Sequence, residues 1–199
     1  MLAFYRSLSY LLYPGSMSLL GLAFIHALYP VNLYVWMVFA FGMVILPLVA
    51  LALFIRMGKV SDIFIYHREQ RHGLYALGVV FASLATGFIF WEAALPAMIW
   101  SACNTVVLLL LFVINYWGVK ASAHMAGVSG LLGWVLCFQC NDLSLLSVIL
   151  LVVAVYAARR GLSAHSHFEL ILGFCLGLFV TFALAYLLLN HYGISCSFV

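Results

Sequence analysis

The sequence predicts an all-α fold: a polytopic transmembrane helical bundle of about six or seven spans with short loops. Hydrophobic residues make up 68% of the chain, charged residues make up 7%, and the mean hydropathy is +1.22. Soluble domains carry roughly 25% charged residues, so this composition excludes a soluble domain. Each span needs about 20 apolar residues, and seven would leave room only for short loops. We therefore expect a single integral membrane domain over residues 1–199.

Seven apolar runs supply the expected spans. Pro14-Gly15 interrupts the first run near its start, and Pro47 predicts a kink in the second. The fifth and sixth runs have only about 14 and 16 residues, so they need flanking residues to cross a bilayer. The expected spans are residues 9–29, 33–56, 74–90, 95–116, 125–138, 143–158 and 168–189.

Three polar stretches, at about 56–72, 117–124 and 159–169, are each separated by two spans, so they are expected on one membrane face. All the basic residues lie on that face, and the positive-inside rule would make it cytoplasmic. An anion site built from the three stretches is a compatible second explanation, favoured by the histidines and carboxylates among them. The basic residues are Arg6, Arg56, Lys59, Arg68, Arg71, Lys120, Arg159 and Arg160.

The third polar stretch holds the densest group of reactive side chains. If a helix begins at Ser163, His165 and Glu169 lie four positions apart and share one face. The carboxylate could then hold one imidazole nitrogen and leave the other for chemistry. Arginine offers a planar fork to phosphate oxygens, and a helix N-terminus adds N–H donors. The candidate phosphate ligands are Arg68, Arg71, Lys120, Arg159 and Ser122, with His124 and His165 as acid and nucleophile.

Two of these segments resemble motifs of the type-2 phosphatidic acid phosphatase superfamily. Arg159, five residues, His165, three residues and Glu169 resembles the third motif, which reads Ser-Arg, five residues, His, three residues, Asp. Residues 121–124, Ala-Ser-Ala-His, resemble the second motif, Pro-Ser-Gly-His. The order of the segments and their separations of about 50 and 40 residues also agree with that family. The resemblance covers about residues 59–169.

The first motif, Lys, six residues, Arg-Pro, is matched only in place, by Arg68 and Arg71. No lysine lies seven positions before either arginine, and His72 stands where the proline would follow Arg71. Alanines replace the proline and glycine of the second motif and, at Ala158, the serine of the third. Glu169 keeps the negative charge of the usual aspartate, but its side chain is one methylene longer. Its contact with the histidine must therefore have a different geometry.

The resemblance implies a lipid phosphatase that needs no metal or other cofactor. His165 would attack phosphorus and form a phosphohistidine, Glu169 would orient it, and His124 would protonate the leaving lipid oxygen. Arg159, Ser122 and Arg71 or Arg68 would hold the phosphoryl oxygens. The expected partners are the lipid bilayer and a membrane lipid phosphate or diphosphate, not nucleic acid. Phosphatidic acid, phosphatidylglycerophosphate and polyprenyl diphosphate all remain open as substrates.

Structural interpretations stand beside these roles. The pair of His165 and Glu169 could cap a helix, and His124 could be a cap or an interfacial anchor. Arg6, Arg56 and Arg160 fit topology anchors, and His167 is read as non-catalytic. Asp62 and Glu69 could pair with Arg68 or Arg71.

Two other functions stay open. One is a catalytically silent relative acting as a scaffold or subunit, which could assemble with itself or with another membrane protein. The other is a haem- or quinone-binding subunit, which needs histidines deep in the spans, where only His26 comes near.

The expected location is a bacterial inner membrane. Positive-inside counting puts the candidate site on the cytoplasmic face, whereas many bacterial members of the family face the periplasm. Cys140 and Cys196 are expected on the opposite face. The remaining cysteines, Cys103, Cys137 and Cys175, are expected to serve packing.

Overall fold

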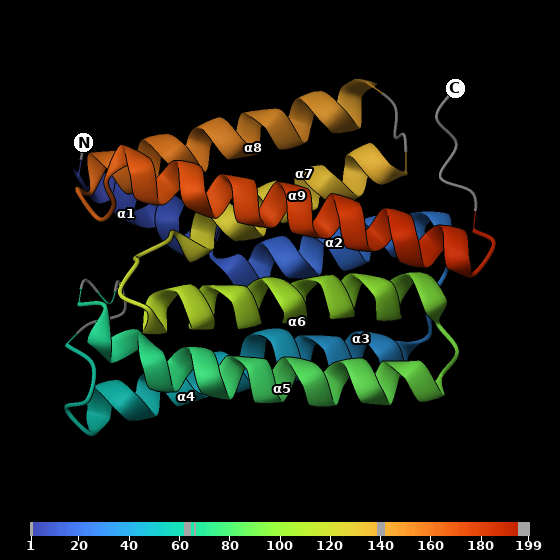
Figure 1. Cartoon of the computed structure of the whole chain (residues 1–199), viewed down its shortest axis with the longest axis horizontal. Helices are drawn as coiled ribbons and strands as arrows, with labels where there is room; N and C mark the ends of the chain where they lie inside the picture. Colours follow the sequence, from blue (N-terminus) through green and yellow to red (C-terminus); the bar gives the residue numbers. More distant parts are fainter. Residues whose placement is uncertain (1, 62–64, 66, 139–141, 195–199) are drawn as a thin grey trace. The chain divides into compact units, whose positions relative to one another are not determined.

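The computed structural model describes residues 2–61, 65, 67–138 and 142–194, and Figure 1 shows their arrangement. Helices dominate these ranges and no strand occurs within them, which confirms the all-α class. Three residues named in the sequence analysis, Asp62, Cys140 and Cys196, lie outside the described residues.

Within the described residues, five helical stretches are long and apolar enough to cross a membrane, so the chain is an integral membrane protein. The helices α1 (Leu2–Leu11) and α2 (Pro14–Leu28) form a pair bent by 47°, which adds a sixth span if the pair counts as one. The helix α7 (Ala123–Cys137) is apolar but only 15 residues long. The five spans are α3 (Leu33–Ala40) continuing through η1 (Phe41–Ile45) and α4 (Leu46–Arg56), η2 (Glu69–Arg71) continuing into α5 (His72–Trp91), α6 (Leu95–Tyr116), α8 (Asp142–Gly161) and α9 (His167–His191).

The expected interruption at Pro14 is confirmed, because α1 ends at Leu11 and α2 begins with that proline. At Pro47 the irregularity takes another form. The π-helical turn η1 precedes the proline, and the N–H of Leu46 donates to the carbonyl of Phe41 five residues back. The chain then continues as α4, since a proline in the first turn of a helix loses no required hydrogen bond.

The sixth expected span is longer than the sequence indicated. Helix α8 covers 20 residues and ends at Gly161, so Arg159 and Arg160 belong to its last turn and not to a loop. Cationic side chains are favourable there, since the carbonyl end of a helix carries partial negative charge. The fifth span did not lengthen in this way and remains short as α7.

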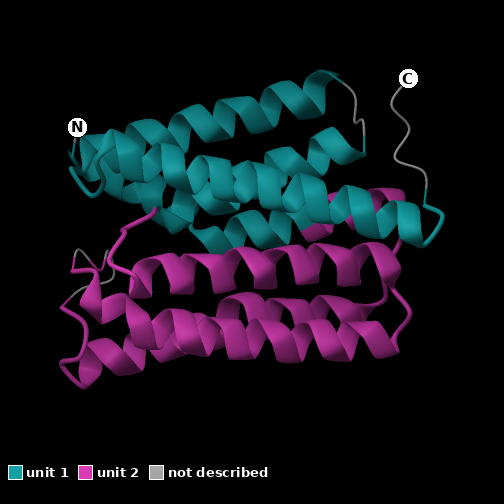
Figure 2. Cartoon of the chain, in the orientation of Figure 1, with its two compact units in different colours: residues 1–21, 122–199 teal, residues 22–121 magenta. Residues whose placement is uncertain are grey.

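The chain divides into two compact units, shown in Figure 2. Unit 1 contains residues 1–21 and 122–199, which include α1, α7, α8 and α9. Unit 2 contains residues 22–121, which include the helices from α3 to α6. The two units are described separately below.

Helix α7 forms the centre of unit 1 and packs against α8 and α9. Its contact with α9 is close enough to require glycine. A Cβ placed on Gly133 would lie 2.7 Å from the carbonyl oxygen of Leu178, and one on Gly177 would overlap the carbonyl oxygen of Ala126. At the end of the pair, the N–H of Ser122 donates to the carbonyl of Glu169 over 3.0 Å. Glycine contacts thus bring the N-termini of α7 and α9 together.

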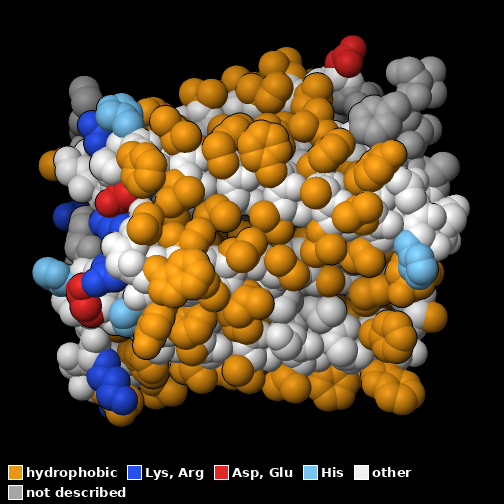
Figure 3. Space-filling view, in the orientation of Figure 1, with side chains coloured by type: hydrophobic (Ala, Val, Ile, Leu, Met, Phe, Trp, Pro, Cys, Tyr) orange, Lys and Arg blue, Asp and Glu red, His pale blue; other side chains and the backbone are white. Residues whose placement is uncertain are grey.

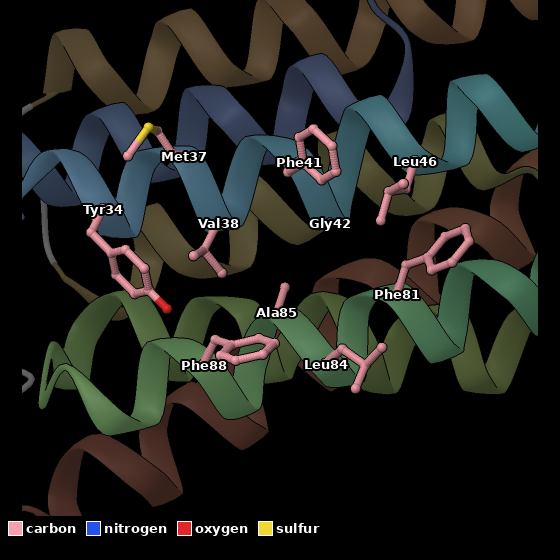
Figure 4. Close-up of a pocket in the computed structure, with 10 residues that line it drawn as sticks. All are labelled: Tyr34, Met37, Val38, Phe41, Gly42, Leu46, Phe81, Leu84, Ala85 and Phe88. Atoms are coloured by element: carbon pink, nitrogen blue, oxygen red, sulfur yellow. The ribbon is translucent and has the colours of Figure 1, made fainter.

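Unit 2 is built from α5 packed against α6 on one side and against the α3–η1–α4 stretch on the other. The hydroxyl of Thr86 in α5 lies 2.8 Å from that of Ser101 in α6, a polar link inside the apolar helices. A groove of about 420 Å³ lies between α3–η1 and α5 (Figure 4). Its lining is hydrophobic apart from the hydroxyl of Tyr34 and holds no charged side chain, so it does not suit a phosphate.

The surface agrees with a membrane-embedded chain. On the face drawn in Figure 3, hydrophobic side chains cover the long sides of the helices, and the Lys and Arg side chains lie near helix ends. Large exposed hydrophobic residues occur on most of the spans, as with Phe88 at 54% and Phe179 at 63% exposure. Such exposure is expected where the solvent is lipid.

The glycine contact between α7 and α9 can be tested by adding one methyl group. Gly177→Ala should destabilise the protein by about 1–3 kcal/mol, because the new Cβ meets the backbone of α7, which cannot move aside cheaply. Thermal unfolding in detergent would measure the loss. The matched control is Gly87→Ala in α5, where a Cβ meets nothing within 4 Å. Equal unfolding temperatures for the two variants would contradict the tight packing.

Candidate active site

The loop from Leu162 to Ser166 in unit 1 carries the candidate nucleophile. Helix α8 ends in a tight turn, in which the N–H groups of Ser163 and Ala164 donate to the carbonyls of Arg160 and Arg159 over 2.9 and 3.1 Å. Ser163 adopts a φ of +51°, the left-handed conformation that usually selects glycine at this position. The turn reverses the chain within a few residues, so His165 lies just before the start of α9.

Helix α9 begins at His167, one residue before the expected span and four residues after the helix start considered at Ser163, and Ser166 is its N-cap. The Ser166 hydroxyl accepts from the N–H of Glu169 over 3.3 Å, and the Glu169 carboxylate accepts from the N–H of Ser166 over 3.2 Å. This reciprocal pair is a capping box, which satisfies two backbone donors at the helix start. The alternative role of Glu169 in capping a helix is therefore present.

The same carboxylate contacts His165. Its Oε2 atom lies 2.8 Å from Nδ1 of the imidazole, so the expected contact between residues four apart is formed although the helix starts between them. The side chain of His165 is 2% exposed and that of Glu169 is 21% exposed. The longer arm of glutamate therefore reaches both the imidazole and the backbone of the cap. A carboxylate placed this way fixes the orientation of the imidazole ring and its tautomer.

Arg159 and His124 both contact Ser9, a residue of α1. The Arg159 Nη1 donates to the Ser9 hydroxyl over 2.7 Å, and both side chains are buried. The His124 Nε2 lies 3.3 Å from the Ser9 carbonyl oxygen. The sequence marks Ser9 only as a polar residue in an apolar run. Its contacts lie more than a hundred positions away and follow no local pattern.

Ser122 links the N-terminal ends of α7 and α9 in unit 1. Its hydroxyl caps α7 by accepting from the N–H of Met125 over 3.4 Å, and its own N–H binds Glu169 as described above. The residue is fully buried. Its expected role as a phosphate ligand stays a prediction.

Two neighbours of the candidate nucleophile have local roles. Arg160 donates from Nη1 to the His165 carbonyl over 2.9 Å, so it supports the loop in addition to any role as a topology anchor. His167 is exposed and bonds through Nδ1 to the hydroxyl of Tyr156 on α8, and its non-catalytic interpretation stays a prediction.

The remaining candidate ligands belong to unit 2. Arg68 forms an ion pair with Glu69 over 3.1 Å, one of the expected pairings, and its Nη1 donates to the carbonyl of Asn115 over 3.1 Å. Arg71 is buried and donates through Nε and Nη2 to the carbonyl of Ile65 over 2.9 and 2.7 Å. Lys120 is half-buried. The convergence of Arg68, Arg71 and Lys120 on His165 stays a prediction.

No three His, Cys, Asp or Glu side chains within the described ranges gather where they could hold a metal ion. Cys103 and Cys137 are buried inside helices, and Cys175 is partly buried. The metal-free chemistry that the resemblance implies stays a prediction as well.

Comparison of the chain with protein-family models, with curated proteins and with solved structures finds no match. Its function is therefore inferred from its own residues and their contacts.

Proposed function

We propose that this chain is a membrane lipid phosphatase that releases phosphate from a lipid phosphate or diphosphate through a phosphohistidine at His165. The contact of 2.8 Å between Nδ1 of His165 and Oε2 of Glu169 is the observation that carries the proposal. A histidine oriented by a carboxylate is an activated nucleophile, because the hydrogen bond fixes the tautomer that has a lone pair on Nε2.

The first half-reaction transfers the phosphoryl group to the enzyme. The lone pair on Nε2 of His165 attacks phosphorus, and the bond from phosphorus to the lipid oxygen breaks. His124 donates a proton to the departing oxygen, and Glu169 stabilises the positive charge that forms on the imidazole. Arg159 binds the phosphoryl oxygens and balances their charge.

The second half-reaction releases phosphate. Water attacks the phosphohistidine while His124, now neutral, accepts a proton from it. The bond from phosphorus to Nε2 breaks, inorganic phosphate leaves, and both histidines return to their starting states. A lipid substrate suits the position of the residues, because His124 and His165 lie at the ends of apolar helices, where head groups are found.

A catalytically silent scaffold is the second candidate, and the capping box favours it. Ser166 and Glu169 stabilise the start of α9 whether or not the chain is an enzyme, so their arrangement has a structural explanation. The two candidates differ in what they predict for the chemistry of His165.

Removing the nucleophile separates the two candidates. We expect His165→Ala to lower phosphate release from lipid phosphates by more than about a thousandfold, because the covalent route is lost. A panel of phosphatidic acid, phosphatidylglycerophosphate and polyprenyl diphosphate would be assayed. Glu169→Gln should cost about a hundredfold, since glutamine keeps the capping box but not the charge.

The control is Ser166→Ala, which removes the cap at a cost of about 1 kcal/mol in stability and leaves His165 and Glu169 in place. Its activity per folded molecule should stay within a few-fold of the wild type. Equal phosphate release by the wild type and His165→Ala on every substrate would leave the scaffold as the better account.

The acid role of His124 predicts a dependence on the leaving group. His124→Ala should slow release from a lipid phosphate by about 10²–10⁴-fold, because an alkoxide needs a proton to leave. p-Nitrophenyl phosphate should lose far less, since its phenolate leaves without one. His167→Ala is the control, because this exposed histidine contacts Tyr156 and should leave both rates unchanged. Equal losses on both substrates would contradict an acid role.

We also propose that the site faces the cytoplasm across a bacterial inner membrane, on the basis of the positive-inside count. A chain that keeps Cys140 as its only cysteine should react with an impermeant thiol reagent in intact cells. Labelling that requires permeabilised cells would place the site on the periplasmic face instead.

A further inference from the structure

Helix α1 buries a polar residue, although most of its other side chains are exposed. Within residues 2–11, Ser9 is the buried one at 3% exposure, whereas Leu2, Phe4 and Leu11 are between 63% and 70% exposed. A hydroxyl removed from solvent costs free energy unless it is hydrogen-bonded. The hydrogen-bond partners of Ser9 therefore explain why a serine is buried at this position.

Ser9 contacts two residues of the proposed mechanism through two different groups. Its hydroxyl accepts from the guanidinium of Arg159 at 2.7 Å, and its carbonyl oxygen lies 3.3 Å from Nε2 of His124. Arg159 is itself buried at 2% exposure. Ala158, the neighbour of Arg159, offers no hydroxyl of its own. The hydroxyl that Arg159 contacts comes instead from Ser9 in α1, 150 positions earlier in the chain.

Two aromatic residues hold Ser9 in place, each four positions from it. Tyr5 packs over Gly161 at the end of α8, where any side chain larger than hydrogen would overlap its ring. Tyr13 meets the ring of His124 edge-on, with centroids 6.1 Å apart. Ser9 is therefore fixed against both α8 and the start of α7.

The nature of the acceptor matters for phosphate binding. Arg68 in unit 2 pairs with the carboxylate of Glu69, which offsets its charge. The partner that Ser9 gives to Arg159 is a neutral hydroxyl, which fixes the direction of the guanidinium without cancelling its charge. A guanidinium carries its five N–H donors in a fixed planar fork, so the direction of the fork decides which phosphoryl oxygens it can reach.

We propose that Ser9 is a positioning residue of the phosphate site: its hydroxyl orients Arg159 and its carbonyl holds His124. The inference rests on the proposed function, because it assigns Ser9 to the same site. Substituting the side chain tests the Arg159 half alone, since the carbonyl remains in every variant.

The test measures the KM for the lipid phosphate and the inhibition constant of inorganic phosphate. Ser9→Ala should raise both by about tenfold, because the guanidinium loses a charge-assisted hydrogen bond that holds it in place. Ser9→Thr restores a hydroxyl and should recover most of the affinity. The control is Ser18→Ala in α2, a buried serine whose hydroxyl bonds to the carbonyl of Pro14 in its own helix.

A double-mutant cycle separates positioning from a general structural role. If Ser9 acts through Arg159, Ser9→Ala should add nothing to the loss of phosphate affinity caused by Arg159→Ala. A purely structural role would lower the unfolding temperature in both backgrounds and leave KM and the inhibition constant unchanged. Either that result or additive losses of affinity would overturn the proposal.

A binding measurement keeps this test distinct from that of the proposed function. If the wild type hydrolyses lipid phosphates, unchanged constants in Ser9→Ala overturn only the role of Ser9. If the wild type hydrolyses none, the rise in unfolding temperature caused by inorganic phosphate replaces the kinetic constants. A rise that Ser9→Ala loses and Ser18→Ala keeps supports the role of Ser9 in an anion site. No rise in the wild type overturns both proposals.

Discussion

The close packing of α7 against α9 is the constraint on which the arrangement of unit 1 depends. Apolar side chains gain little free energy by moving from lipid into a helix interface. Helices in a membrane therefore associate through close backbone contact at small residues. Gly133 and Gly177 permit that contact, and a Cβ on Gly173 would overlap the carbonyl oxygen of Ser122. Because the glycines set the axial register of the two helices, they also set the hydrogen bond between Ser122 and Glu169.

That register makes Glu169 the shared element of the candidate site. Its carbonyl binds the start of α7, and its carboxylate binds both the N-cap of α9 and Nδ1 of His165. Structure and proposed chemistry therefore use the same atoms. The arm of the glutamate is long enough for its Oε2 to reach the imidazole and the N-cap of α9 at the same time. Stability and activity must therefore be measured separately for any variant of Glu169.

Local patterns in the sequence predicted more of the fold than of the site. Composition and apolar runs predicted the helices, Pro14 predicted the break, and the spacing of four predicted the contact of His165 with Glu169. The end of α8 was misplaced, because Arg159 and Arg160 look like loop residues although cations are favourable in a last helical turn. The contacts of Ser9 depend on how distant helices pack and leave no periodic trace in the sequence.

Two buried arginines, Arg71 in unit 2 and Arg159 in unit 1, donate to neutral hydrogen-bond acceptors. Arg71 donates to the carbonyl of Ile65 and Arg159 donates to the hydroxyl of Ser9, so each guanidinium has a neutral group among its acceptors. Burying a cation is costly, and a carboxylate partner would reduce that cost while also reducing the attraction for an anion. Neutral acceptors supply hydrogen bonds and preserve the charge. In the proposed phosphate site, the hydroxyl that α1 brings to Arg159 therefore orients the guanidinium without adding a negative charge beside it.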